Sequence, residues 1–553
     1  MGEQGERIPY GGTSIKYLQM MQISMISSLL ISPVLMIHVK CSGCACYNKK
    51  CDRNAGVTND TRTCTIVNSP IPTLNISDFS LPCIEGLENI TFINNNMKAI
   101  QAGFFSNSTN LTYLDLSQNP DIGGTIQHTL NSLNNTKLET LFLNNISMND
   151  QILSEYYAFL PRTLRTLSLR ANELTTFPMT YVQRLHNLTE LDLSHNIHFR
   201  HLEVQDVNLT LPLKNLSLAF TGFFWKKLFT NNRNSCVLPE LAYLNLSHTF
   251  VNVSTIAVAN NCLQNLQYLI VKHCIFEDGL YNNSFKYLSN LKNLSLSETF
   301  NIYQVPVMSM PLEHLDMNDL KFTFSENNNT MYMFSNLMRL KHLEIRKLNL
   351  GAWKHSSLEI FLKPLKNLTY LDASCNGLNF LPTVIQTFSK LENLILTNNT
   401  ITELGNAISK SMILKNIHLQ YNRIEIVDVH GLPNTVKTLD LSGNPFRCTC
   451  GLVPYIIWVK EQKLYTSKLV EEWRKTYFCA HPLEKRNKSL VLFHPKPTDC
   501  QPFNKYVITA MVLCCLMVLI VFVTNIVECY KERKTNKKTH PKFRYRRLQR
   551  TAS

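Results

Sequence analysis

The sequence predicts an α/β solenoid, a curved stack of short units that each add one strand to a parallel sheet. The clearest unit is residues 187–196, NLTELDLSHN. Counted from Leu188 as position 1, it has leucines at positions 1, 4 and 6 and Asn196 at position 9. Alternate side chains of a strand point to opposite faces, so the leucines enter a core and the residues between them line an exposed sheet. One unit cannot bury its own leucines, and neighbouring copies are therefore required.

Fifteen copies of this leucine-rich repeat occupy residues 87–444, and they start 21 to 28 residues apart. Each unit contacts only its neighbours, so the array can grow to this length as one elongated horseshoe. The predicted solenoid accounts for most of the 553 residues. The repeats start at Leu87, Leu111, Leu138, Leu164, Leu188, Leu213, Leu241, Leu266, Leu291, Leu312, Leu340, Leu368, Leu391, Leu414 and Val436.

Position 9 of the repeat is asparagine in eight of the fifteen units. A buried amide there can satisfy backbone groups of the adjoining turn. Six consecutive units in the middle lack it, which predicts a change of curvature or twist and divides the array into three parts. The asparagines are Asn95, Asn119, Asn172, Asn196, Asn376, Asn399, Asn422 and Asn444, and the other units have Ile146, Thr221, Thr249, Cys274, Thr299, Leu320 and Leu348.

Residues 1–40 resemble a secretory signal with a long leading segment, because the apolar run 23–39 follows two basic residues. Cleavage after Ala45, cleavage just before Cys41 and an uncleaved anchor all fit this segment.

Residues 41–86 are cysteine-rich and have no leucine periodicity, which predicts a disulfide-bonded N-terminal cap for the exposed end of the solenoid. The number of cysteines in the cap depends on the cleavage point, and their pairing cannot be deduced from sequence. The cysteines are Cys41, Cys44, Cys46, Cys51, Cys64 and Cys83.

Residues 445–503 predict a second cap, which begins with the sequence NPFRCTC after the last repeat. Apolar residues of this cap are placed to pack over the last repeat as a lid: Leu452, Ile456, Ile457 and Trp458. A zinc site that includes His481 is the alternative, but an exported chain favours disulfides. The cysteines concerned are Cys448, Cys450, Cys479 and Cys500.

Four further cysteines lie within the repeats. Cys236 and Cys262 stand five and four residues before successive repeat starts, so stacking can bring them together as a disulfide. Cys274 replaces the position 9 asparagine and Cys375 precedes Asn376. We expect both of these to be free thiols.

Asparagine-linked glycosylation is predicted by eighteen Asn-x-Ser/Thr triplets, all before residue 500. Asn215 and Asn293 at position 3 and Asn245 at position 5 should point from the concave face. If these three acceptors are glycosylated, sugars cover the middle of the concave face and a ligand is displaced to a flank, the convex side or the C-terminal third. The alternative is that several of the acceptors are not glycosylated. The acceptors are Asn59, Asn75, Asn89, Asn107, Asn110, Asn134, Asn145, Asn187, Asn208, Asn215, Asn245, Asn252, Asn282, Asn293, Asn328, Asn367, Asn398 and Asn487.

Residues 507–527 are 21 residues without a charge, which is long enough to cross a bilayer as a helix. The tail, residues 528–553, holds +8 of the chain's net charge of +15, which places it on the cytoplasmic side and near anionic lipid. The sequence therefore predicts a single-pass type I protein of the cell membrane with an extracellular N-terminus. Cys529 is a palmitoylation candidate or a free juxtamembrane cysteine.

From Cys41 to Lys534 the chain resembles a Toll-like receptor. The resemblance lies in the order of the predicted parts, which are a signal, a cysteine-rich cap, the repeats, a second cap, a membrane helix and a basic segment. The broken asparagine ladder strengthens the resemblance, since a three-part ectodomain is typical of the members that sense lipopeptide and lipopolysaccharide. The resemblance implies an innate-immunity glycoprotein that binds a microbial or endogenous ligand or a partner receptor, with homo- or heterodimers among the expected assemblies.

A Toll-like receptor carries a TIR domain after its membrane helix, and a domain needs upwards of about 50 residues. Only 26 residues follow Val527. The resemblance therefore implies a decoy or co-receptor that lacks a TIR domain, or else a truncated product. The alternative function is a leucine-rich repeat protein for cell adhesion or matrix binding.

Binding rather than catalysis is the expected activity, because no nucleophile, phosphate loop, metal spacing or cofactor motif stands out. Outside its tail the chain is only mildly basic, which argues against a nucleic-acid site. The irregular unit at residues 321–334 suggests a ligand or partner contact, or else the core of a longer convex loop. Its aromatic residues include Phe322, Phe324, Tyr332 and Phe334.

Overall fold

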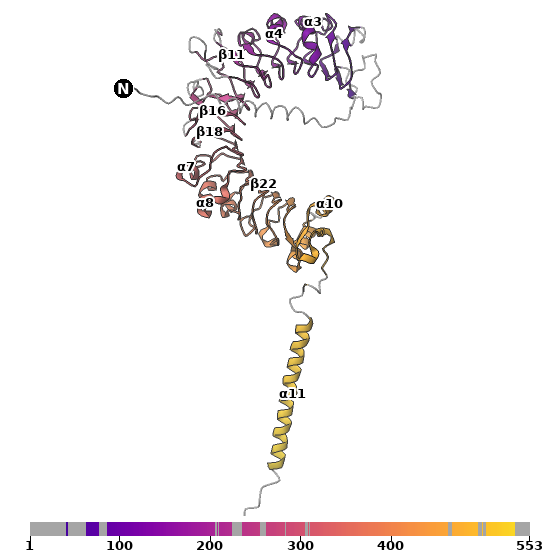
Figure 1. The fold of residues 1–553 in the computed structure, drawn as a ribbon, viewed down its shortest axis with the longest axis vertical. Coiled ribbons are helices and arrows are strands. Elements are labelled where there is room, and N and C mark those ends of the chain that lie inside the picture. The colour runs from indigo at the N-terminus through magenta and orange to yellow at the C-terminus, as the bar shows by residue number, and fades with distance from the viewer. Residues whose placement is uncertain are drawn as a thin grey trace, which may run out of the picture.

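The computed structural model describes residues 40–42, 62–76, 86–204, 207, 210–223, 230, 235–254, 262–281, 284–304, 308, 310–462, 467–495, 500 and 505–536. Within these ranges one 17-stranded sheet runs along the inside of an arc (Figure 1). Its first pair of strands is antiparallel and every later pair is parallel. The predicted leucine-rich repeat solenoid is confirmed.

The main sheet adds its strands in chain order, and in most pairs the central leucine of one strand is paired with the central leucine of the next, as for Leu191 and Leu216. Its strands are β1 (Lys40–Ser42), β2 (Thr63–Val67), β4 (Asn89–Ile93), β6 (Tyr113–Asp115), β7 (Thr140–Phe142), β8 (Thr166–Ser168), β10 (Glu190–Asp192), β12 (Asn215–Ser217), β13 (Tyr243–Asn245), β15 (Tyr268–Ile270), β17 (Asn293–Ser295), β19 (His314–Asp316), β20 (His342–Glu344), β21 (Tyr370–Asp372), β22 (Asn393–Ile395), β23 (Asn416–His418) and β24 (Thr438–Asp440).

The leucines of positions 1, 4 and 6 form one continuous core under the sheet. In the repeat of residues 187–196, Leu188, Leu191 and Leu193 are all buried, while Glu190 between them is exposed. Burial of a leucine side chain contributes about 2 kcal/mol, so the period of the leucines sets both the direction of each strand and the register of the stack.

Helices and short sheets close the outer side of the arc (Figure 1). The two ends of the array are covered mainly by helices, whereas the central part is covered by a three-stranded sheet. The outer elements are β3 (Thr73–Leu74), β5 (Ala99–Ile100), η2 (Pro120–Thr125), α3 (Ile126–Ser132), α4 (Asp150–Tyr156), η3 (Tyr157–Phe159), β9 (Thr176–Pro178), α5 (Thr180–Arg184), β11 (His201–Glu203), β14 (Phe250–Val251), β16 (Ile275–Leu280), β18 (Phe300–Ile302), α7 (Asn328–Met331), η4 (Leu350–Ala352), α8 (His355–Leu362), η5 (Thr383–Thr387) and η6 (Val429–Gly431).

The asparagine at position 9 joins each unit to the one before it. The Oδ1 atom of Asn196 accepts hydrogen bonds from the backbone N–H groups of Asn172 and Leu174 at 3.1 and 3.2 Å. Its Nδ2 atom donates to the carbonyls of Leu169 and Leu193 at 3.0 and 2.8 Å. All eight position 9 asparagines make such bonds to the preceding unit. A single buried amide therefore satisfies four backbone groups.

The central units replace this bridge with weaker contacts. Thr221, Thr249 and Thr299 are buried, and each hydroxyl donates to a carbonyl of its own unit at 2.6 to 2.8 Å. Cys274 is a free, buried thiol whose Sγ donates to the Leu246 carbonyl of the preceding unit at 3.0 Å. Burial raises the pKa of Cys274 to about 12, so the thiol stays protonated. The ribbon turns in this part, around β16 and β18 (Figure 1).

A disulfide between Cys236 and Cys262 joins neighbouring units inside this asparagine-free part, with Cα atoms 5.4 Å apart. A covalent link restrains the chain where the amide bridge is missing. Cys375 is a free thiol, like Cys274.

The C-terminal cap contains β25 (Phe446–Arg447), η7 (Cys450–Leu452), α9 (Val453–Glu461), α10 (Ser467–Thr476), β26 (Cys479–His481), η8 (Leu483–Lys485) and η9 (Leu490–Leu492). Disulfides join Cys448 to Cys479 and Cys450 to Cys500.

Leu452 and Trp458 are buried under the cap and Ile456 packs against the same core. The expectation that Ile457 belongs to this lid is wrong, because α9 turns that side chain to solvent with 49% of it exposed. Buried Tyr455, Trp473 and Tyr477 complete the lid instead.

Less of the N-terminal cap is described. Cys64 is disulfide-bonded and buried, and Cys41 belongs to β1. The predicted signal region before Lys40 lies outside the described residues, as do Cys44, Cys46, Cys51, Cys83 and the acceptors Asn59, Asn208 and Asn282.

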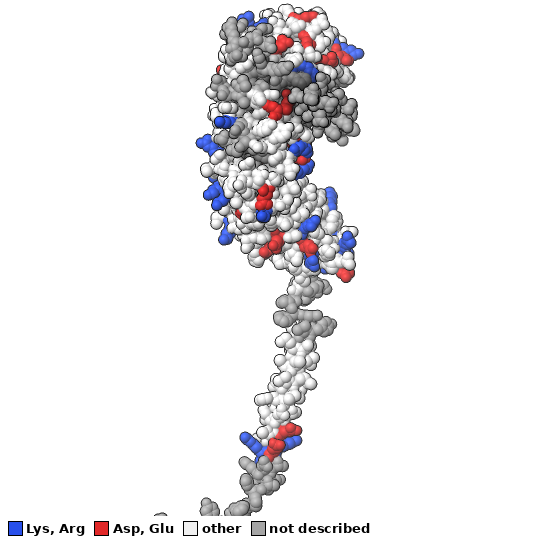
Figure 2. All heavy atoms as spheres, turned by 60° about the vertical axis from the view of Figure 1, so that its left-hand side comes forward, with Lys and Arg blue, Asp and Glu red and all other residues white. Residues whose placement is uncertain are grey.

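Helix α11 (Lys505–Asn536) is long and apolar enough to cross a membrane, and its apolar part has a mean hydropathy of 2.8. In Figure 2 it is a rod free of charged residues except at its far end. Cys529 is exposed near that end, where palmitoylation of the thiol stays a prediction. Residues 537–553 of the basic tail lie outside the described part of the chain.

The amide bridge can be tested by replacing Asn196 with alanine. The variant leaves buried backbone groups of two units without partners, so we expect a loss of about 3 kcal/mol in the free energy of unfolding. Thr221→Val is the matched control, because it removes one bond within a single unit and should cost about 1 kcal/mol. Thermal unfolding of the full chain followed by circular dichroism measures both, and equal losses would contradict a special role for the amide.

Candidate interaction surface on the concave face

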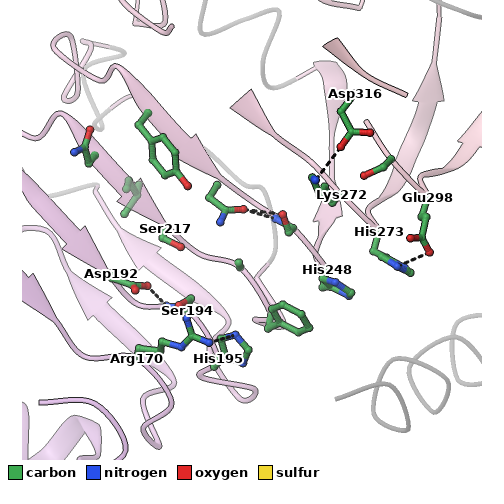
Figure 3. Close-up of a pocket in the computed structure, with 18 of the residues that line it drawn as sticks. Arg170, Asp192, Ser194, His195, Ser217, His248, Lys272, His273, Glu298 and Asp316 are labelled. Atoms are coloured by element: carbon green, nitrogen blue, oxygen red, sulfur yellow. Dashed lines mark hydrogen bonds and ion pairs between the residues drawn. The ribbon is translucent and has the colours of Figure 1, made fainter. Parts of the chain in front are cut away.

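A hollow of about 980 Å³ lies on the concave face of the central repeats. It is lined mainly by side chains of positions 3, 5, 7 and 8, which point away from the leucine core, and it reaches down to the position 4 leucines Leu167, Leu191 and Leu216. The strands that carry them run from β7 to β20, so the hollow covers the part of the array in which the asparagine ladder is broken (Figure 3). Its residues include Arg170, His195, Phe220, His248, Lys272 and Glu344.

Position 8 of each unit has a left-handed backbone. His195, Phe220, His248 and His273 have φ angles between 52° and 61°. This conformation costs a residue with a Cβ atom about 1 kcal/mol or more, and the buried turn on either side maintains it. Because each unit makes the same turn at the same place, the four side chains project in one direction and lie above one another.

These four side chains form a column of stacked rings along one edge of the hollow, which we call the ring column. Ring centroids are 4.3 Å apart between His195 and Phe220, 3.8 Å between Phe220 and His248, and 4.4 Å between His248 and His273. The planes are tilted by 18° or less. Stacking uses the ring faces, so the edges with their nitrogen atoms are left for other contacts.

Charged groups close the two ends of the ring column (Figure 3). At one end a guanidinium nitrogen of Arg170 lies 2.9 Å from Nε2 of His195. At the other end Nε2 of His273 lies 2.6 Å from a carboxylate oxygen of Glu298. The four rings therefore lie between a cationic and an anionic side chain, and the whole row extends over six successive units.

Two of the three imidazoles of the ring column, those of His195 and His248, are uncharged at neutral pH. Burial lowers the pKa of His195 to about 4, and the positive charge of Arg170 acts in the same direction. Burial also lowers the pKa of His248 to about 4, with His273 and His195 adding to the effect. Asp192 opposes the shift at His195. A neutral imidazole offers one donor and one acceptor, so the ring column has mixed hydrogen-bonding edges.

The floor of the hollow is polar and holds both signs of charge. Asp192 accepts a bond from the backbone N–H of Ser194 at 2.9 Å, and Asn245 does the same for Ser247 at 3.1 Å. These bonds fix the turn that leads into position 8. Lys272 spans two units to reach Asp316, with Nζ 2.8 Å from the carboxylate. A surface of this kind suits a partner that is itself polar and of mixed charge.

Two predicted glycan acceptors line the hollow. Asn215 and Asn245 lie on its floor, and Nδ2 of Asn215 donates to Glu190 at 3.0 Å. Asn293 is in β17, two strands further along the sheet from Asn245. Attached sugars would occupy part of the concave space, and whether these acceptors are used stays a prediction.

The structure does not bring the four aromatic residues of segment 321–334 together as one site. Phe324 and Phe334 are buried, and Phe334 packs on Phe361 with centroids 4.4 Å apart. Phe322 is half-buried against Phe324, whereas Tyr332 is 54% exposed and lines a separate groove. These residues therefore mainly fill the core of a long outer loop.

The ring column was not among the sites predicted from the sequence. The available signal was an aromatic or histidine residue at position 8 of four consecutive repeats, three of which lack the asparagine at position 9. The left-handed turn that aligns these residues becomes visible only in the structure.

The ring column predicts acid sensitivity. Because His195 and His248 have pKa values of about 4 in the fold and 6.5 as the ordinary value, the unfolded chain binds more protons between these pH values. Stability should therefore be full above about pH 6.5 and decline as the pH falls towards 4. Thermal midpoints at pH 7 and pH 5 measure the decline, which should shrink in His248→Gln and persist in His430→Gln, a variant of an exposed histidine. An equal decline in both variants would contradict the assignment.

The parallel sheet, the amide-bridged turns and the disulfide-bonded C-terminal cap together define a leucine-rich repeat protein. Its homologues are CD180 and the Toll-like receptors. Human CD180 antigen is 24% identical over 446 residues, which cover 73% of this chain and 63% of CD180. Toll-like receptor 4 of Bos taurus is 24% identical over 523 residues, which cover 81% of this chain and 61% of the receptor.

The chain thus spans about three fifths of the length of these relatives. Among solved structures, the mouse RP105/MD-1 complex aligns with a TM-score of 0.57 and 19% identity, over 81% of this chain and 76% of that chain. This likeness concerns the fold. A scan against protein-family models finds no match.

Proposed function

We propose that this protein is a single-pass cell-surface receptor of the Toll-like type that binds a protein partner on the concave face of its central repeats. The observation that carries the proposal is the hollow between Arg170 and Lys347, with its ring column and its polar floor. Homology to CD180 and Toll-like receptors supports a role in innate immunity. No enzymatic step is part of the proposal.

The chemistry of the hollow favours a protein over a lipid or a small apolar ligand. Small-molecule pockets are mostly apolar and enclose their ligand. This hollow instead offers ring edges, carboxylates and cationic groups over several strands (Figure 3). A partner protein that covers about 800 Å² could meet the ring column and the Lys272–Asp316 pair together.

The kind of partner protein is inferred from a solved structure with a similar fold. The mouse structure similar in fold is a complex of RP105 with MD-1. We therefore infer that an MD-1-type protein occupies the concave face of this chain, and that the acceptors Asn215 and Asn245 restrict its position.

The proposed orientation places the N-terminus outside the cell. All predicted glycan acceptors precede residue 500, and the Lys and Arg residues that follow the apolar part of α11 favour the cytoplasmic side. Extracellular repeats, a membrane helix and an inner basic tail are the arrangement that a surface receptor requires.

Lys272→Glu tests the site. The substitution reverses a charge on the floor of the hollow, next to Asp316, so we expect at least about a tenfold loss of affinity for MD-1. Lys410→Glu makes the same charge change at an exposed position of a later repeat and should leave binding unchanged. Both variants are expressed as full chains with tagged MD-1, and retention is measured by pull-down from the cell surface.

Equal retention by Lys272→Glu and the unchanged chain would contradict the concave site. Failure of the unchanged chain to retain MD-1, with aggregation of cells that express it, would instead favour the adhesion function.

A further inference from the structure

An apolar groove of about 600 Å³ is lined by residues of α8, of the segment that follows α8 and of the segment that follows α7. Both helices lie on the outer side of the arc (Figure 1). Two of the large apolar side chains that line the groove are solvent-exposed, Tyr332 to 54% and Met338 to 67%. Exposed apolar grooves are places where an apolar face of another group can bind. The groove is lined by Tyr332, Ser335, Met338, Ile360, Pro364 and Asn367, with Lys363 and Lys366 beside them.

One lining residue is a predicted glycan acceptor. Asn367 begins the triplet Asn-Leu-Thr, and its Nδ2 atom donates to the Met338 carbonyl at 2.7 Å. Nδ2 is the atom to which an N-linked sugar is attached. The first sugar would therefore start beside Met338, at the edge of the groove.

We propose that the N-linked glycan of Asn367 is the occupant of this groove. Its first N-acetylglucosamine has an apolar ring face and an acetyl methyl group, which match the methionine side chain and the tyrosine ring. Its hydroxyl groups remain toward solvent and toward Lys363 and Lys366. The glycan thus serves as a covalently attached cover for an apolar surface.

The attachment step is ordinary oligosaccharyl transfer. Nδ2 of Asn367 forms a bond to the anomeric carbon of the sugar and loses one proton, while the bond from that carbon to a lipid-linked pyrophosphate breaks and the pyrophosphate leaves. The amide retains one N–H, which can continue to donate to Met338. Attachment at the edge gives the sugar a high effective concentration in the groove, which a free ligand lacks.

Asn187 provides a matched comparison. It occupies the same place in its repeat, begins the same Asn-Leu-Thr triplet, and donates from Nδ2 to the Arg162 carbonyl at 2.9 Å. The hydrogen bond is thus a general feature of the repeat. The position of Asn367 on the rim of an apolar groove is what distinguishes it.

Oxidation of Met338 by hydrogen peroxide measures whether the groove is covered. The full chain is oxidised on intact glycosylating cells, and sulfoxide at each methionine is followed by peptide mass spectrometry. Thr369→Ala removes the triplet and keeps Asn367. We expect Met338 to oxidise several-fold faster in Thr369→Ala than in the unchanged chain. Met412, which is 86% exposed, should react equally in both.

Asn367→Gln should reproduce the fast oxidation of Met338, and Asn187→Gln should not. Thr369 donates to the Lys341 carbonyl, so Asn367→Gln also covers the case in which Thr369→Ala does not fold. An unmodified Asn367 in the unchanged chain would overturn the proposal. So would slow oxidation that persists in both variants, which would indicate a second copy or an amphiphile in the groove. Asn328 is a second acceptor, four residues before Tyr332. If Met338 oxidises fast only in the Asn328→Gln variant, the glycan of Asn328 and not that of Asn367 covers the groove.

Discussion

The structure depends on one repeated interaction, the buried side-chain amide at position 9 that bonds to the backbone of two successive turns. Leucine burial drives each unit against its neighbours, but apolar contacts alone do not fix the angle between units. The amide does, because its acceptor and donor atoms meet polar backbone groups of both units at about 3 Å. A change in the angle between units would leave these backbone groups without hydrogen-bond partners inside the core, and this costs free energy.

The central third links its units in other ways, and most of the candidate site lies there. Threonine hydroxyls bond within their own unit, and the Cys236–Cys262 disulfide and the ring column provide links between units. The hollow on the concave face extends over this part of the array. We infer that the loss of the amide bridge and the location of the binding surface are related, since a less restrained turn allows the concave face to adopt the shape a partner needs.

Much of the fold could be predicted from the sequence, because a leucine period leaves one way to bury each unit. The side chains of a strand alternate between its two faces, and this alternation also predicted that Asn215 and Asn245 point from the concave face. Features that depend on how one repeat unit is placed against the next could not be predicted from the sequence. The alignment of His195 with Phe220 requires a left-handed turn, and the exposure of Ile457 depends on the rotation of α9. The groove under Met338 combines residues of two repeats, so no single motif indicates it.

Hydrogen exchange measures the central claim most directly. In the full chain in lipid nanodiscs, the backbone amides of Asn172 and Leu174, which donate to Asn196 Oδ1, should exchange slowly. The corresponding amide of Thr221, in a unit followed by a threonine at position 9, should exchange markedly faster. Equal protection of the two turns would contradict the account, because it would show that the amide bridge does not set the local stability of the solenoid.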